Sequence, residues 1–180
     1  MKLWNDIQAY FYKRHLQEKI QSAKPKRVLT NLADAKSIGI IYDSTNPDND
    51  IVITRFAENL RKQGKEVEML GFIDDAKLDH KADIPVFNKK KLDWKKVPND
   101  PRVDAFVEKK FDLLLACFVD ENLPLEFIAA TSNAKWRLGP YDEKKTSYYD
   151  MMINLGSKNN LPYFLEQSVD FLNKIKYDSK

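Results

Sequence analysis

Residues 37–74, SIGIIYDSTNPDNDIVITRFAENLRKQGKEVEMLGFID, constrain the fold more than any other stretch, because they have the pattern of strand, loop, helix and strand. The first strand, predicted at residues 38–42, is a nearly continuous apolar run, which is typical of parallel strands buried on both faces. A second strand is predicted at residues 67–72, and Gly64 is placed just past the end of the helix. Two parallel strands joined by a crossover helix predict an open α/β sheet, in which ligands bind beside the carboxyl ends of the strands.

The rest of the chain repeats this alternation of strands and helices. Further strands are predicted at residues 85–88, 113–118, 134–138 and 149–154, and helices at residues 3–23, after Pro101, after Pro124 and at residues 162–176. Residues 28–36 fit either a short helical turn or a connector. We therefore expect a Rossmann-like or flavodoxin-like three-layer sandwich with a mostly parallel sheet and an N-terminal helical extension. The expected division is an extension at residues 1–36 and a single α/β domain at residues 37–180.

The composition and the apolar runs of the chain indicate its expected location in the cell. No apolar run approaches the roughly 20 residues that cross a bilayer. The first fifteen residues lack the apolar core of a secretory signal. Cys117 is the only cysteine, so an internal disulfide is excluded and a reducing, cytoplasmic location is expected.

Charge is distributed unevenly between the two predicted parts. Residues 1–36 contain eight Lys and Arg against three Asp and Glu, whereas the remainder contains 22 basic and 24 acidic residues. A basic arm on a nearly neutral body indicates a segment that contacts another molecule. The candidate contact residues combine aromatic and basic side chains: Trp4, Tyr10, Phe11, Lys13 and Arg14.

Three interpretations of the N-terminal helix remain open from the sequence. It packs on the sheet as a surface helix, docks on a protein or ribonucleoprotein partner, or lies on an anionic membrane surface. The lysine-rich residues 89–96, which surround Trp94, either extend a basic face or form a solvated loop. Sequence-specific nucleic-acid binding is not expected at a net charge of +3.

Polar side chains follow three of the predicted strands. Asp74 and Asp75 follow the second strand, and if these loops share one edge they form an acidic crevice for a cation or a polar ligand. The same residue types are favoured in turns and helix caps, so a purely structural role is the alternative. The candidate crevice residues from the other two loops are Asp43, Ser44, Thr45, Asn46, Asp120, Glu121 and Asn122.

The segment NAKWRLGPY, residues 133–141, is a further candidate. Arg137 and Tyr141 offer a guanidinium and a phenol for an anionic group. In the alternative interpretation, Trp136 and Leu138 pack on one face and Arg137 is exposed or paired with an acid.

Several classes of site are disfavoured. No glycine-rich phosphate-binding motif occurs, and Asp48, Asn49 and Asp50, which are predicted to cap the helix, place acids where a phosphate would bind. His15 and His80 are not clustered, and Cys117 lies in an apolar run. The sequence therefore predicts no catalytic residue, no metal and no cofactor.

Five phrases together resemble an uncharacterised family of short α/β proteins from Bacteroidetes: IGIIYDSTNPDN, LGFID, FNKKKLDW, FDLLLACFVDENLPLEFIAATSNAKWRLGPY and YDMMINLG. This resemblance covers nearly the whole chain and implies no activity. Residues 111–141 are also similar to the nucleotide-sugar-binding half of heptosyltransferase-like glycosyltransferases, through a strand beginning D-L-L, a helix and an A-K-x-R-x-G phrase. The second resemblance implies the same fold class.

Two functional hypotheses follow. The first is a cytoplasmic, non-catalytic binding or accessory protein that contacts its partner through the basic N-terminal helix. The second is an enzyme or sensor that binds a small sugar- or nucleotide-like molecule in the polar crevice.

Overall fold

Strands and helices alternate along the chain, as the sequence predicts. The computed structural model describes residues 2–22, 25–77 and 84–176. In chain order the elements are α1 (Lys2–Ser22), β1 (Ser37–Asp43), α2 (Pro47–Lys62), β2 (Glu66–Ile73), β3 (Val86–Asn88), the 3-10 turn η1 (Lys89–Lys91), α3 (Pro101–Glu108), β4 (Leu113–Cys117), α4 (Leu123–Thr131), β5 (Trp136–Pro140), the 3-10 turn η2 (Glu143–Lys145), β6 (Met151–Ile153) and α5 (Leu161–Lys174).

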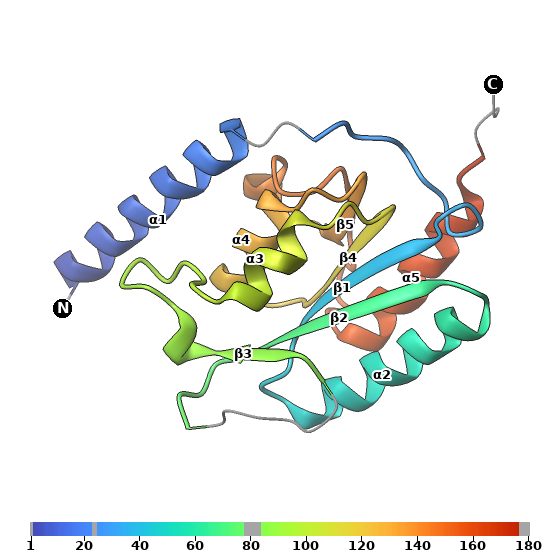
Figure 1. Cartoon of the computed structure of the whole chain (residues 1–180), viewed down its shortest axis with the longest axis horizontal. Helices are drawn as coiled ribbons and strands as arrows, with labels where there is room; N and C mark the ends of the chain where they lie inside the picture. Colours follow the sequence, from blue (N-terminus) through green and yellow to red (C-terminus); the bar gives the residue numbers. More distant parts are fainter. Residues whose placement is uncertain (1, 23–24, 78–83, 177–180) are drawn as a thin grey trace.

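Within the described ranges, six strands form one sheet in the order β3-β2-β1-β4-β5-β6 (Figure 1). Every neighbouring pair is parallel. This is the strand order of the doubly wound Rossmann fold, and it differs from the flavodoxin order. The predicted α/β class is confirmed, and the sheet is parallel throughout.

Helices cover both faces of the sheet. On one face, α2 and α5 pack against side chains of β1 that include Ile40. On the other face, α3 and α4 pack against side chains that include Ile41. Alternate residues of β1 thus enter the two halves of the core, which accounts for its unbroken apolar sequence.

The start of α2 corrects one prediction. Asn46 is the N-cap, its Oδ1 accepting a hydrogen bond from the Asp48 backbone N–H at 3.0 Å, and Pro47 is the first helical residue. The expectation that Asp48, Asn49 or Asp50 caps the helix is wrong, because all three lie inside its first turn. Asp50 instead points inward and accepts a hydrogen bond from the Tyr42 hydroxyl at 3.0 Å.

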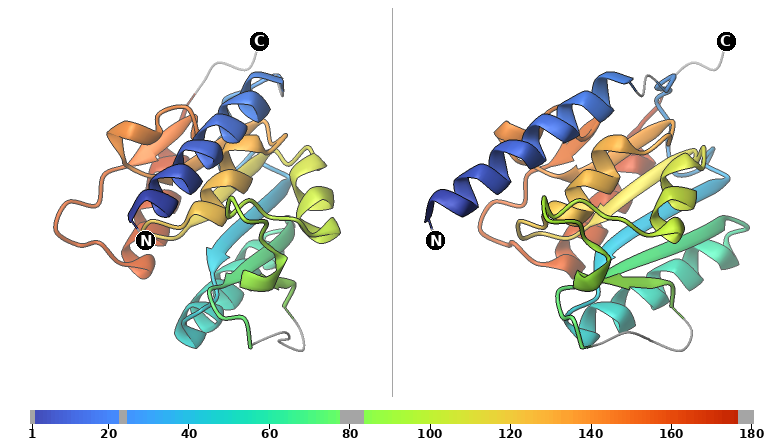
Figure 2. Two further views of the ribbon diagram at one scale, coloured as in Figure 1. Left: turned by 90° about the vertical axis from the view of Figure 1, so that its left-hand side faces the viewer. Right: turned by 60° about the vertical axis from the view of Figure 1, so that its left-hand side comes forward.

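Helix α1 forms an additional layer outside α4. Tyr12 and Leu16 are buried against Phe127 and Ala130, and the Tyr12 hydroxyl donates a hydrogen bond to the Leu123 carbonyl at 2.7 Å. Figure 2 shows the helix crossing α4, with its N-terminal end projecting beyond the rest of the domain. The described part of the segment between α1 and β1 is a connector with a turn at residues 32–34, which resolves the choice that the sequence left open.

At the amino edge of the sheet, Asp112 joins three segments. Its carboxylate accepts hydrogen bonds from the backbone N–H groups of Lys36 and Ser37 at 2.9 and 3.0 Å, and from the Lys135 ammonium at 2.7 Å. Partial burial acts to raise the pKa of Asp112, but the hydrogen bonds from Lys135, Ser37 and Lys36 outweigh it and lower the pKa to about 2. The side chain ties the starts of β1 and β5 to the residue before β4.

This tie predicts a stability loss in acid. Because the pKa of Asp112 is lower in the folded than in the unfolded chain, its contribution is complete above about pH 4 and disappears as the pH falls toward 2. We expect Asp112→Asn to lower the free energy of unfolding at pH 7 by about 1–2 kcal/mol and to lose less stability than the wild type between pH 4 and 2. Urea denaturation across that range measures both effects. Asp170→Asn, which changes an exposed carboxylate on α5, is the control, and a parallel pH dependence in all three proteins would contradict the assignment.

Candidate functional site

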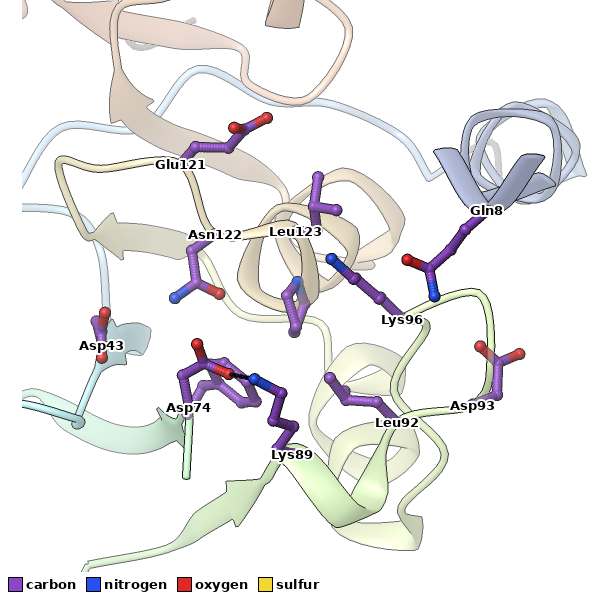
Figure 3. Close-up of a pocket in the computed structure, with 12 residues that line it drawn as sticks. Gln8, Asp43, Asp74, Lys89, Leu92, Asp93, Lys96, Glu121, Asn122 and Leu123 are labelled. Atoms are coloured by element: carbon purple, nitrogen blue, oxygen red, sulfur yellow. Dashed lines mark ion pairs between the residues drawn. The ribbon is translucent and has the colours of Figure 1, made fainter. Parts of the chain in front are cut away.

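A pocket of about 470 Å³ opens at the carboxyl ends of the central strands (Figure 3). Strand β1 leads into α2 on one face of the sheet, and β4 leads into α4 on the other, so the loops that follow them diverge. This is the topological switch point at which open α/β folds bind ligands. We call the pocket the switch-point crevice; its walls come from the ends of β1, β2 and β4, from residues 89–96 and from α1.

Asn122 forms the upper wall of the crevice. The residue is 9% exposed and caps α4, its Oδ1 accepting a hydrogen bond from the Leu125 N–H at 3.3 Å. Its own backbone N–H donates to the Glu126 carboxylate at 3.1 Å. The side-chain nitrogen faces the crevice, and no acceptor in the described part of the chain is paired with it. The nitrogen is accessible to solvent, so it can donate a hydrogen bond to a ligand oxygen that replaces water.

Carboxylates surround this amide. Asp43 ends β1, and its Oδ1 accepts a hydrogen bond from the Thr45 N–H at 2.8 Å. Asp74 follows β2 and forms an ion pair with Lys89 at 2.9 Å. Glu121 is exposed and has no ion-pair partner among the described residues. Asp43 and Glu121 therefore place negative charge in the crevice, and neither carboxylate forms an ion pair within the described residues.

Lys96 supplies the opposite charge. It is the one non-glycine residue of the described chain with a positive φ, 65°. Such a conformation costs about 1 kcal/mol or more and persists where the surroundings impose it. Here Asp93 imposes it, because its carboxylate accepts from the Lys95 and Val97 N–H groups and its carbonyl accepts from the Lys96 N–H. The Lys96 ammonium extends toward the crevice, on the opposite side of Asn122 from Asp43 (Figure 3).

The other predicted residues of the first loop support the backbone. Ser44 is fully buried and donates a hydrogen bond to Asp50 at 2.5 Å. The Thr45 hydroxyl accepts from the Asp74 N–H at 2.9 Å, which holds the ends of β1 and β2 together. Asn46 is the cap of α2.

Asp120 and Tyr141 lie apart from the switch-point crevice. They line a separate groove of about 720 Å³ beneath α1, between the start of α4 and the segment after β5. Glu121 borders both cavities. Of the nine predicted crevice residues, the structure thus brings Asp43, Glu121 and Asn122 to one pocket.

Arg137 is buried in the interior of the fold. Its guanidinium donates to both carboxylate oxygens of Asp150, at 2.9 and 3.0 Å, and to the Ala130 carbonyl at 3.0 Å. This is the pairing with an acid that the sequence left as the alternative. Arg27 also lies near Asp150, at 3.7 Å, so one carboxylate faces two guanidinium groups.

The predicted contact residues of α1 are on the surface. Trp4, Tyr10 and Phe11 are exposed, and Arg14 pairs with Glu18 in the next turn of the helix. Lys13 borders the groove beneath α1.

Two crevice residues, Gln8 and Lys96, have no signal in the sequence. Gln8 reaches the pocket only because α1 returns across α4, and its side-chain amide donates to the Trp94 carbonyl at 2.5 Å. Lys96 belongs to a lysine-rich run whose left-handed turn depends on Asp93.

The remaining reactive side chains do not converge. Cys117 is buried, and burial raises the pKa of its thiol. His15 stacks on Phe127, and its pKa is lowered by burial and by the nearby Lys95 charge. His80 lies outside the described residues.

Comparison with known families assigns the chain. The model of a family of unknown function (DUF6913) matches residues 8–175. The chain belongs to this family. None of the curated proteins matches the sequence.

The DUF6913 match begins at Gln8, so it contains most of α1 together with every strand of the sheet. All twelve residues that line the switch-point crevice lie inside the matched region. Across the described residues, no helix combines the length and apolar character needed to cross a membrane.

The burial of Arg137 leads to a prediction. Asp150→Ala leaves a buried guanidinium without its carboxylate, and we expect the free energy of unfolding to fall by about 3–5 kcal/mol. Chemical denaturation measures the loss. Asp142→Ala, which removes a more exposed carboxylate paired with Lys145, should cost no more than about 1 kcal/mol. Equal losses in the two variants would show that the Arg137 pair is not a core interaction.

Proposed function

We propose that the protein binds a small amino-carboxylate, such as an amino acid, in the switch-point crevice. The observation that carries this proposal is the Asn122 side-chain nitrogen, which is accessible from the pocket and has no acceptor among the described residues, on a residue that is only 9% exposed. A protein that leaves such a donor at the ligand-binding position of its fold is well arranged to accept a ligand oxygen.

The charges around Asn122 favour a zwitterion. Lys96 suits a carboxylate, the Asn122 nitrogen suits a ligand oxygen, and Asp43 and Glu121 suit an ammonium group. Phe72, Leu92, Leu123 and Pro124 also line the crevice and provide apolar contact for the body of the ligand. Opposite charges on either side of one pocket select a molecule that carries both.

A phosphate-containing ligand fits less well. The helix start that lines the crevice, that of α4, has Pro124 in its first turn, and the Leu125 N–H is already bonded to Asn122. Glu126 adds negative charge in the same turn. No glycine is among the described residues that line the crevice, whereas glycines are typical of phosphate cradles.

The proposal concerns binding, and it includes no chemical step. Of the two functional hypotheses from the sequence, the position of α1 favours the crevice, because Gln8 completes its wall. We further propose a cytoplasmic location, which the single, buried cysteine supports.

A thermal-shift screen tests the proposal. The probes are the twenty standard amino acids, simple alkylamines, simple carboxylates and inorganic phosphate. We expect at least one amino acid to raise the melting temperature by about 3–6 °C at ten times its Kd. The amine, carboxylate or phosphate alone should give a smaller shift.

Two substitutions locate the site. Asn122→Asp keeps a capping oxygen for α4 but removes the amide donor, and Lys96→Asn keeps a residue that tolerates positive φ. Each should weaken binding about tenfold, because a hydrogen bond to a charged group is worth about 1.5–3 kcal/mol. Lys91→Asn, which changes an exposed lysine outside the crevice, should bind normally. The proposal would be refuted if no amino acid binds, or if the Asn122→Asp and Lys96→Asn variants bind amino acids as tightly as the wild type does.

A further inference from the structure

Large exposed apolar side chains concentrate at one end of the molecule. Trp4, Tyr10 and Trp94 are 58%, 60% and 50% exposed. With three neighbouring side chains they form a surface that we call the aromatic patch. Its members are Leu3, Trp4, Ile7, Tyr10, Phe11 and Trp94.

The patch is continuous. The ring of Trp94 lies 6.1 Å from that of Trp4 and 5.4 Å from that of Phe11, and Phe11 lies 5.4 Å from Tyr10. With roughly 200 Å² of accessible area for each side chain, the exposed apolar surface is on the order of 600 Å². That value is at the upper end of the largest patch on a typical monomer, and patches of this size mark interaction sites.

The helix holds the patch in place. Tyr12 and Leu16, on the opposite side of α1, are buried against α4, so the patch is presented outward. The bond from Gln8 to the Trp94 carbonyl joins the helix to the lysine-rich segment. In Figure 2 the patch-bearing end of α1 projects beyond the neighbouring elements.

Positive charge borders the patch. Residues 89–96, which include Trp94, contain five lysines and one aspartate, with Lys89 paired to Asp74 and Lys95 to Asp93. Helix α1 adds four basic residues against two acidic ones, and Arg14 and Glu18 are paired with each other, which leaves three basic residues and one acid. The surface is therefore complementary to a negatively charged one.

These features distinguish among occupants. A second copy of the chain would bring the lysines of two patches together, and like charges repel. Single-stranded nucleic acid favours rings that offer open faces for stacking, whereas these rings meet each other at 40°, 65° and 82°. Tryptophan, tyrosine and aliphatic side chains beside lysines are the combination that enters the interface of an anionic bilayer.

We propose that the aromatic patch docks the protein on anionic lipid surfaces. The rings of Trp4, Phe11 and Trp94 enter the boundary between headgroups and acyl chains, about 5–10 Å deep. Lys90 and Lys91, which are exposed, remain at the level of the headgroups and attract anionic lipid. The attachment is peripheral, because the inserted residues occupy only part of one helix and one loop.

Vesicle binding tests this proposal with the 180-residue chain. Co-sedimentation is measured with vesicles of phosphatidylcholine alone and of phosphatidylcholine with 30% phosphatidylglycerol. We expect binding to the anionic vesicles, at least tenfold weaker binding to the neutral ones, and a decrease at 0.5 M salt. Tryptophan emission should shift to shorter wavelength on binding, because Trp4 and Trp94 are exposed in the free protein.

Variants separate the contributions of the rings and the charges. Trp4→Ser with Phe11→Ser should weaken binding to anionic vesicles at least tenfold. Lys90→Glu with Lys91→Glu should do the same, since each basic residue near such a surface contributes about a fivefold factor. Phe171→Ser, on α5, removes an equally exposed ring outside the patch and is the matched control.

Two results would overturn the proposal. One is that the wild-type protein, shown to be folded by circular dichroism, does not bind anionic vesicles, or that the variant with Trp4→Ser and Phe11→Ser binds them as tightly as the wild type does. The other is a dimer in sedimentation equilibrium that dissociates on Trp4→Ser while vesicles capture neither form, which would assign the patch to a second copy.

Discussion

The position of β1 at the centre of the sheet is the constraint on which the rest of the structure depends. Its parallel pairing with β2 on one side and β4 on the other requires the following helices to cross on opposite faces. The loops after β1 and β4 therefore separate, and the space between them becomes the crevice. The same arrangement places α4 on the face of the sheet opposite α2 and α5, where α1 covers it. A strand that is apolar on both faces is the sequence feature that makes this arrangement stable.

Much of the fold was predictable because it depends on local patterns. The apolar runs of β1 and β4, the proline that begins α3 and the proline in the first turn of α4 locate these elements within a residue or two. The cap of α2 was less accessible, since Asn46, Asp48 and Asp50 are all good caps and only the position of Pro47 at the start of the helix decides among them. Strand β5 begins two residues later than predicted, because the Ala134 N–H is bonded to the Ser132 hydroxyl rather than to the sheet.

The candidate site was predictable only in part, because polar residues serve folding and binding with the same chemistry. Asp43 and Asn122 could be anticipated from their place at strand ends. Nothing in the local sequence distinguishes them from Ser44, whose hydroxyl donates a hydrogen bond to Asp50 inside the fold. The partner of Arg137 lies thirteen residues away on another segment. Lys96 and Gln8 depend on tertiary contacts, one through a turn that Asp93 holds and the other through a helix that folds back.

The hydrogen bond between Gln8 and Trp94 has a thermodynamic consequence. Gln8 lines the crevice, and Trp94, two residues before Lys96, belongs to the aromatic patch. One short loop therefore takes part in both surfaces. Any free energy by which a bound molecule changes the preferred position of this loop must alter affinity at the other surface by the same factor. Under the two proposals, a crevice ligand that shifts this loop would change affinity for a lipid surface, and lipid binding would change affinity for the ligand equally.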